Sequence, residues 1–251
     1  MSVLSQQFVI RARLRADRPA DASVFPFTLP AVAALDALDF HPGVTVLIGE
    51  NGSGKSTILE ALAISQGFNA EGGSRHMAFN TRASHSVLHE HIRVAKGMRR
   101  PKTGYFLRAE SFFNVATHID DLDAEPASAP PIIDAYGGVS LHEQSHGESF
   151  MALMLHRFSG QGLYILDEPE AALSPQRQLA ALKRMHDLVA EGAQFIVATH
   201  SPILMGYPDA WIYECSARGL QRVDYDDTEH VQISRRFLND RQRMLERLLG
   251  D

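Results

Sequence analysis

Short apolar runs that stop at glycine or at acidic residues dominate the hydropathy pattern of this chain. The first is Val44–Ile48, in which Thr45 stands among four apolar residues and Gly49 follows. β-Branched residues in such a run favour a buried strand. Leu163–Leu166 and Gln194–Ala198 have the same character and are typical of strands buried on both faces of a parallel sheet. The pattern therefore predicts an α/β protein.

Weaker periodic patterns predict the remaining elements. Residues 8–15 alternate arginine with apolar residues, which suits a half-exposed strand at a sheet edge. Residues 88–95 place apolar side chains at i, i+4 and i+7 before Gly97, so we expect a helix there. The tail over 233–249 predicts one amphipathic helix. Further helices are expected over 31–38, 55–65, 149–158 and 176–189, a strand over 105–108, and a hairpin of 211–214 with 220–223.

The first apolar run leads into a glycine-rich loop with the letters GENGSGKST. These contain the pattern G-x-x-x-x-G-K-[ST] without a gap. Glycines let backbone N–H groups point at a phosphate chain, and the helix that starts at Lys55 directs its positive end at the same anion. In such a loop Lys55 contacts the β- and γ-phosphates and Ser56 binds Mg²⁺. The predicted nucleotide-binding residues are Gly49, Glu50, Asn51, Gly52, Ser53, Gly54, Lys55, Ser56 and Thr57.

The other two apolar runs end in residues that suit phosphoryl chemistry. Asp167 and Glu168 follow the second run, and His200 follows the third. Beside a phosphate loop, Asp167 can hold Mg²⁺ through water and Glu168 can orient and deprotonate the attacking water. His200 can hydrogen-bond the γ-phosphate, although a histidine at a strand end is often purely structural. The predicted catalytic residues are Lys55, Glu168 and His200, and the predicted metal ligands are Ser56 and Asp167.

The order of these motifs resembles the ATP-binding-cassette (ABC) ATPase superfamily, in which a signature loop and an Asp-Glu pair follow the phosphate loop and a distal histidine comes last. The signature falls on residues 144–148, Gln-Ser-His-Gly-Glu. Ser145 and Gly147 match the family's LSGGQ signature, whereas His146 and Glu148 depart from it. The resemblance implies that the loop heads a helix and closes on the γ-phosphate of a nucleotide held by a second copy, so that Ser145 and Gly147 bind in trans.

Three other places in the chain bear on the proposed nucleotide site. Residues 171–174, Ala-Ala-Leu-Ser, stand where the family's D-loop usually ends in Asp. The Q-loop glutamine is not found at its expected strand end, and Glu110 is the nearest candidate. Phe25 and Phe27 precede the phosphate loop and can either stack on adenine or pack in the core.

The sequences of these motifs are most similar to those of small stand-alone bacterial ATPases, which are grouped with AAA-type and chromosome-maintenance-like (SMC-like) ABC proteins. This resemblance implies a P-loop NTPase fold of ABC type: a mostly parallel central sheet flanked by helices, an N-terminal antiparallel β portion and a helical, signature-bearing subregion. We expect a single domain, 1–251, with that subregion at about 67–160. The resemblance also implies ATP and Mg²⁺ as ligands, ATP hydrolysis, and an ATP-dependent homodimer that encloses two nucleotides.

Composition limits the partners. The net charge of −6 argues against a chain-wide basic surface for nucleic acid, although Lys96–Lys102 form a local basic run that can contact phosphate. Cys215 is the only cysteine, which excludes an intramolecular disulfide and fits a reducing compartment. We find no signal peptide and no window of about 18 uncharged apolar residues. We therefore expect a cytoplasmic protein with no integral membrane segment.

The sequence leaves the biological role open. The leading hypothesis is a non-transporter, SMC-like ATPase that acts on an unknown protein client. One alternative is the nucleotide-binding subunit of an ABC transporter, which docks on a membrane partner through the region between the phosphate loop and the signature. A second is a DNA-repair or defence ATPase that binds nucleic acid with the basic run. A third is a nucleotide sensor that does not hydrolyse ATP.

Overall fold

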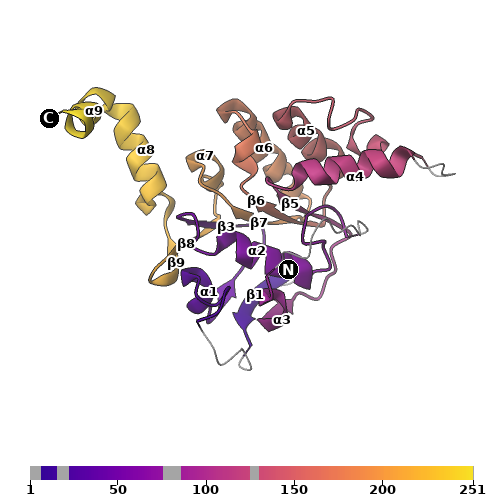
Figure 1. The fold of residues 1–251 in the computed structure, drawn as a ribbon, viewed down its shortest axis with the longest axis horizontal. Coiled ribbons are helices and arrows are strands. Elements are labelled where there is room, and N and C mark those ends of the chain that lie inside the picture. The colour runs from indigo at the N-terminus through magenta and orange to yellow at the C-terminus, as the bar shows by residue number, and fades with distance from the viewer. Residues whose placement is uncertain (1–6, 16–22, 76–85, 125–129, 251) are drawn as a thin grey trace.

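The computed structural model of the chain describes residues 7–15, 23–75, 86–124 and 130–250. A six-stranded sheet in the order β5-β6-β7-β3-β8-β9 forms its centre, with helices on both faces (Figure 1). The strands are β3 (Val44–Gly49), β5 (Thr103–Arg108), β6 (Gly162–Asp167), β7 (Gln194–Ala198), β8 (Trp211–Ser216) and β9 (Gly219–Val223). The arrangement confirms the predicted α/β fold.

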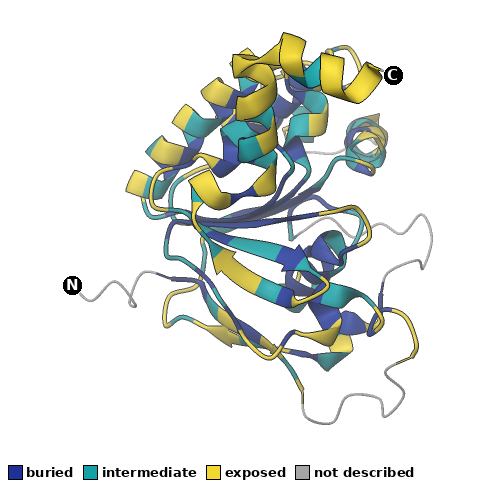
Figure 2. Ribbon diagram, turned by 90° about the vertical axis from the view of Figure 1, so that its left-hand side faces the viewer, coloured by how far each residue is buried: buried dark blue, intermediate teal, exposed yellow. Residues whose placement is uncertain are grey.

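The central sheet is parallel from β5 to β8, and β9 alone runs antiparallel to its neighbour β8. Every residue of β3, β6 and β7 is buried, because helices cover both faces (Figure 2). Parallel strands end at one edge of a sheet. The ends of β3, β6 and β7 therefore bring Gly49, Asp167 and Ala198 to the same edge, which is where the site is built.

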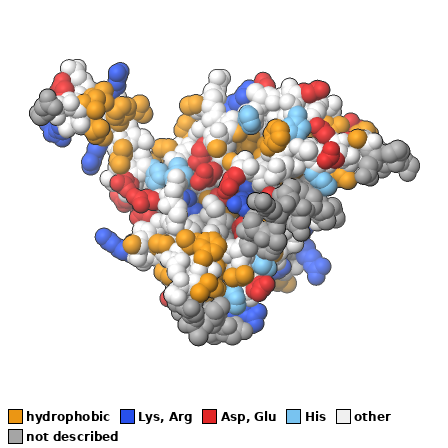
Figure 3. Space-filling model, in the orientation of Figure 1, with side chains coloured by type: hydrophobic (Ala, Val, Ile, Leu, Met, Phe, Trp, Pro, Cys, Tyr) orange, Lys and Arg blue, Asp and Glu red, His pale blue; other side chains and the backbone are white. Residues whose placement is uncertain are grey.

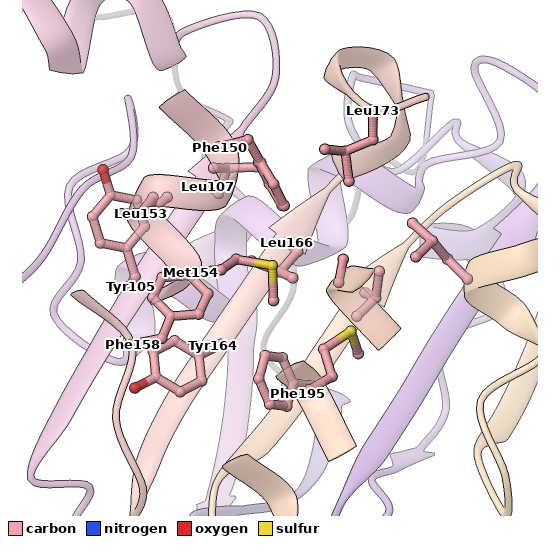
Figure 4. Close-up of a cluster of buried hydrophobic side chains, with 14 of the residues drawn as sticks. Tyr105, Leu107, Phe150, Leu153, Met154, Phe158, Tyr164, Leu166, Leu173 and Phe195 are labelled. Atoms are coloured by element: carbon pink, nitrogen blue, oxygen red, sulfur yellow. The ribbon is translucent and has the colours of Figure 1, made fainter. Parts of the chain in front are cut away.

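Two hydrophobic cores lie on the two faces of this sheet. Alternate residues of β3 divide between them: Val46 belongs to one core and Leu47 to the other. The first core packs against α6 (Pro175–Ala190), and its aromatic part includes Phe158 stacked on Tyr164 with ring centroids 4.1 Å apart (Figure 4). The second core packs against α2 (Lys55–Ser65). Both helices are thereby fixed relative to the strands that carry the site residues.

A three-stranded antiparallel sheet, β2-β1-β4, provides the N-terminal β portion. It consists of β1 (Val9–Leu14), β2 (Leu38–Asp39) and β4 (Ile92–Lys96). The prediction that residues 8–15 form an edge strand is wrong, because β1 pairs with a neighbour on each side. Arg11 and Arg13 are exposed as expected, but the pattern reports one solvated face of the strand and not a free edge.

The predicted helix over 88–95 is also wrong in its second half. Only α3 (Leu88–His91) is helical, and β4 begins at Ile92. The segment contains the β-branched Ile92 and Val94, which pair with β1 through Leu14 and Ala12. Strand pairing has overridden a short helical periodicity here.

Residues 103–157 connect the central sheet to the candidate signature loop. They contain β5, α4 (Phe112–Ala124), α5 (His146–Ala152) and a π-helical turn, Leu153–Arg157. Within the expected subregion at 67–160, β4 and β5 belong to the two sheets, and after the short α3 its helical part starts at α4. Two short helices complete the body, α1 (Pro30–Ala33) and α7 (Pro202–Met205).

The C-terminal tail is a pair of helices and not the single helix that we predicted. A break at Asp240, with φ −143° and ψ 57°, separates α8 (Glu229–Asn239) from α9 (Arg241–Leu249). This pair, the C-terminal arm, projects from the body and carries exposed apolar and basic side chains (Figures 1 and 3). Val231 is its only buried residue. No helix in the described ranges is long and apolar enough to cross a membrane.

Candidate active site

The loop after β3 has the backbone conformation that a phosphate cradle requires. Gly49, Gly52 and Gly54 have φ values of +137°, +78° and +106°, a region that favours glycine. A Cβ on Gly49 would lie 2.3 Å from the carbonyl oxygen of Cys215, so no side chain fits there. Gly54 is the N-cap of α2, which turns the positive end of that helix toward the loop.

The Lys55 side chain lies inside this loop. It is 4% exposed, and its Nζ donates hydrogen bonds to the carbonyl oxygens of Gly49 (2.7 Å) and Glu50 (2.9 Å). Burial lowers its pKa below the ordinary value, while Cys215 and nearby carboxylates oppose the shift. Ser53 is buried, and its hydroxyl has no hydrogen-bond partner among the described residues. The loop thus holds a buried ammonium group and a free hydroxyl beside its amides.

The two predicted metal ligands meet at the C-terminal end of β6. Ser56 Oγ donates to Asp167 Oδ1 at 3.1 Å, although 111 residues separate the two in sequence. Asp167 is 3% exposed, and burial raises its pKa to about 6, against the smaller lowering effects of Ser56 and Arg108. One hydroxyl and one carboxylate are hard oxygen ligands that suit Mg²⁺ when phosphate oxygens and water complete its shell. The residues therefore fit the implied ion.

Glu168 lies beside Asp167 with a conformation of its own. Its φ of +51° and ψ of 50° lie in the left-handed region, which is costly for a residue with a Cβ. Its backbone N–H donates to Ala198 O at 2.9 Å, so β7 holds it in place. The side chain is 41% exposed, and Oε1 lies 3.5 Å from Nε2 of His200. The carboxylate and the imidazole thus face the same opening.

Two further residues at this edge were not predicted from the sequence. Glu170 accepts a hydrogen bond from the backbone N–H of His200 through Oε1. His230, near the start of α8, lies with Nε2 3.2 Å from Nδ1 of His200. Glu170 carries a weak signal, since it falls two residues after Glu168. His230 carries none, because the fold alone brings the C-terminal arm to this point.

The candidate signature loop is preorganised at the N-terminus of α5. Ser145 is the N-cap and forms a capping box with Glu148, in which Ser145 N and Oγ lie 3.0 and 2.6 Å from Glu148 Oε2. These bonds, assisted by Arg177, lower the pKa of Glu148. Gly147 is buried, and a Cβ there would lie 2.8 Å from Ala172 O. Glu148 therefore has a structural use as the third residue of the helix.

The signature loop does not meet the phosphate loop within one copy. Apart from the backbone bonds within α5, the hydrogen bonds of residues 144–148 in the described part of the chain go to residues 139–149 and to Arg177. Ser145 is exposed to solvent. The structure thus brings together Lys55, Ser56, Asp167, Glu168 and His200 but leaves Ser145 and Gly147 apart from them.

The remaining motif positions have mixed outcomes. Phe27 is buried and packs edge-on against His91, so it takes the core role. Glu110 follows β5 and pairs with Arg108 at 3.2 Å, which in turn pairs with Glu60 at 2.8 Å. Ser174 N-caps α6, accepting from Arg177 N at 3.4 Å. These contacts give Glu110 and the 171–174 segment structural partners and leave their predicted roles untested.

Two cavities flank the site. One, of about 480 Å³, lies between the phosphate loop and the β8–β9 hairpin and is lined by Gly52, Ser53, Arg218 and His230 among others. The other, of about 430 Å³, is largely apolar and lies between α4 and α5, where Phe112, Leu141 and Phe150 line it. Glu110 and Gln144 lie at its polar part. The second cavity thus adjoins the candidate signature loop.

Two protein-family models match the chain. One, described as an AAA domain, matches residues 32–98. The other, described as "AAA domain, putative AbiEii toxin, Type IV TA system", matches residues 133–206. The first match contains the phosphate loop, and the second contains the signature loop, Asp167, Glu168 and His200.

Similar proteins include two sugar-import ATP-binding proteins. Ribose import ATP-binding protein RbsA of Jannaschia sp. (strain CCS1) is 29% identical over 198 residues, covering 69% of this chain and 36% of that protein. Arabinose import ATP-binding protein AraG of Pseudomonas fluorescens (strain Pf0-1) is 27% identical over 201 residues, with the same coverage of 69% and 36%. The chain therefore spans 36% of the length of these relatives.

A solved structure of an ATP-binding cassette of an ABC transporter shares the fold. Its TM-score is 0.52 at 15% identity, covering 90% of this chain and 98% of that chain. The AAA-domain matches and the two ATP-binding relatives support an ABC-type ATPase superfamily for this chain, while the solved structure shows the shared fold.

Proposed function

We propose that this chain binds ATP with Mg²⁺ in the phosphate loop and hydrolyses it. The observation that carries the proposal is the convergence of three strand ends on that loop: Ser56 bonds Asp167, and Glu168 faces His200. These are the positions that a γ-phosphate, a metal ion and an attacking water require in phosphoryl transfer. A loop with a purely structural role would not need the buried carboxylate of Asp167 beside the hydroxyl of Ser56.

Each group has a distinct task in this proposal. The loop amides and Lys55 bind the phosphates and neutralise charge that develops on the leaving group. Ser56 and Asp167 hold Mg²⁺, which supplies further charge neutralisation at the phosphates. Glu168 orients the water and accepts its proton. His200 donates a hydrogen bond to the γ-phosphate.

We infer that the active unit is a head-to-tail dimer. In one copy, the exposed Ser145 and the buried Gly147 lie away from the phosphate loop, at the N-terminus of α5. Such a terminus binds anions, but the γ-phosphate that it would reach belongs to a second copy. A homodimer then encloses two nucleotides, each held by one copy and covered by the other.

The preferred role is that of a non-transporter, SMC-like ATPase in the cytoplasm with a protein client. The position after β5 carries Glu110, paired with Arg108, where a transporter-type coupling loop would carry glutamine. The second candidate is the nucleotide-binding subunit of a transporter, which the names of the two sugar-import relatives favour. The apolar cavity between α4 and α5 would then receive the membrane partner. Co-purification with a membrane protein would support this second role.

A turnover assay with three proteins tests the proposed chemistry. The wild type should hydrolyse ATP in the presence of Mg²⁺ and lose activity with EDTA. Glu168→Gln should bind ATP but lower kcat at least about 100-fold, as expected when a general base is removed. Lys55→Ala should lose nucleotide binding. A wild type that binds MgATP without turnover would instead identify a nucleotide sensor, and turnover by Glu168→Gln at the wild-type rate would disprove the role of Glu168.

The nucleic-acid alternative rests on the basic run at 96–102. Lys96 Nζ bonds Ser65 O at 3.1 Å, whereas Arg99 and Arg100 are exposed and line a groove with Arg75. DNA stimulation of the ATPase that disappears at raised salt would favour this role.

A further inference from the structure

His230 is the one residue of the C-terminal arm that bonds the predicted catalytic histidine. Its Nε2 lies 3.2 Å from Nδ1 of His200, and the two ring centroids are 5.4 Å apart with the planes tilted by 48°. The first turn of α8 supplies it, 30 residues after His200. His230 also lines the cavity beside the phosphate loop.

The position of His230 is fixed by its neighbours at the base of the arm. Thr228 is fully buried, and its Oγ1 donates to Tyr225 O at 2.8 Å. Val231 is buried against the core. On the opposite side, Glu170 holds the backbone N–H of His200. Both imidazole rings are therefore presented by anchored backbone.

The hydrogen-bond chemistry of the pair restricts the protons. Of two neutral imidazole nitrogens in contact, one donates and the other accepts. Nε2 of His200 faces Glu168 Oε1 at 3.5 Å and makes no hydrogen bond among the described residues. Because an ionised carboxylate or a phosphate oxygen only accepts, Nε2 must carry the proton to bind either one. Nδ1 of His200 is then the acceptor, and Nε2 of His230 is the donor.

We propose that His230 is a positioning residue: its Nε2–H bonds Nδ1 of His200 and keeps the His200 proton on Nε2, where it faces the γ-phosphate. This inference rests on the proposed ATPase function. Nδ1 of His230 is buried and has no hydrogen-bond partner among the residues that the structure describes, which fits a bare nitrogen better than an unpaired N–H. Burial, with a smaller contribution from His200, lowers the pKa of His230 and so favours its neutral form.

Paired substitutions test the donor role by kinetics. His230→Leu removes the donor, whereas His230→Gln keeps an amide N–H at similar reach. We expect His230→Leu to lower kcat about tenfold with the KM for ATP unchanged, because a single hydrogen bond is lost and the loop is untouched. His230→Gln should recover most of that loss. Gln232→Leu on the same helix is the matched control and should keep the wild-type kcat, because the Gln232 side chain is hydrogen-bonded to Asp226 O and not to either histidine within the described part of the chain.

A second measurement does not depend on hydrolysis. In protein labelled with ¹⁵N-histidine, His200 is assigned by the signal missing from His200→Gln, and the ¹⁵N shifts identify its tautomer. We expect a protonated Nε2 and a bare Nδ1 in the wild type, and loss of this preference in His230→Leu but not in His230→Gln. An unchanged tautomer in His230→Leu, or equal kcat losses in the Leu and Gln variants, would overturn the proposal. A wild type without turnover would refute the proposed function alone, since the spectrum still decides the tautomer.

Discussion

Asp167 is a predicted site residue whose charge is opposed by burial in the fold. Burial raises its pKa to about 6 from an ordinary value of 3.8. Among the described residues, no group of three or more carboxylate, histidine or cysteine side chains is placed to hold a metal ion. A metal-free protein therefore carries a carboxylate that is costly to ionise. This cost is the reason that a cation and a phosphate chain would be bound strongly here.

Replacing Asp167 by Asn should stabilise the metal-free protein at neutral pH. The folded state holds this proton more tightly than the unfolded state, so stability falls as pH rises from about 4 to about 6. Asn cannot ionise and escapes this loss. We expect a gain of up to about 3 kcal/mol in the free energy of unfolding at pH 7.5, shrinking at pH 5, measured by urea denaturation in EDTA. A variant less stable than the wild type at pH 7.5 would contradict this account.

Gly147 shows how one residue sets the shape of the signature loop. A Cβ on it would lie 2.3 Å from Nη1 of Arg177 and 2.8 Å from Ala172 O. Gly147→Ala should therefore lower the free energy of unfolding by about 1 to 3 kcal/mol in thermal denaturation, despite the better helix propensity of alanine.

A double variant separates the two clashes. Adding Arg177→Ala removes the flexible neighbour but leaves the backbone oxygen of Ala172, so it should recover only part of the loss. Full wild-type stability of Gly147→Ala alone would show that the loop tolerates a side chain, contrary to the structure.

At the scale of elements, one buried side chain joins the two sheets. Gln194 of β7 accepts hydrogen bonds from the N–H groups of Phe8 and Val9 at 3.0 and 2.9 Å. Its amide donates to Val9 O at 2.8 Å and to His41 O at 3.0 Å. These bonds fix the antiparallel sheet beneath the strands that carry the site.

Gln194→Leu should destabilise the fold strongly. The substitution leaves two buried N–H groups without acceptors, at a cost of about 2 to 4 kcal/mol. Thermal unfolding of this variant beside the exposed Gln176→Leu, which should match the wild type, measures the effect. Equal stability of the two variants would show that water or a rearranged backbone replaces these bonds.

The elements that the sequence predicted well are those whose hydropathy pattern fits only one kind of structure. Val44–Ile48 and Leu163–Leu166 are buried on both faces, and their ends carry the motif residues, so pattern and fold agree. The alternation at 8–15 fits both an edge strand and a central strand with one solvated face, and only pairing with β2 and β4 distinguishes them. The helical periodicity at 88–95 was likewise overridden, because residues 92–96 pair with β1 as a strand.

The residues of the candidate site also fall into those that a local pattern predicts and those that only the fold brings together. Gly49 to Thr57, Asp167 and Glu168 follow from local motifs, because phosphate binding needs their residue types at fixed spacing. His230 and Glu170 depend on which strand ends and helix starts meet in space. A single sequence gives no spacing rule for such contacts.

At the scale of the whole molecule, the two parts of the proposed nucleotide site, the phosphate loop and the signature loop, lie at different places in one copy. The phosphate loop lies at the end of β3, while Ser145 heads α5 in the helical part of the chain. The arm adds a third feature, since α8 starts at the site and then projects from the body (Figure 1). A second copy is therefore the simplest source of the missing half.

Light scattering on the Glu168→Gln variant tests this central claim most directly. With MgATP, the account predicts twice the mass of one chain, because unhydrolysed nucleotide holds the dimer closed, and the added substitution Ser145→Arg should return the mass to one chain while ATP still binds. A mass that stays that of one chain with one ATP bound per chain would contradict the shared site, and so would a dimer that forms equally well with Ser145→Arg.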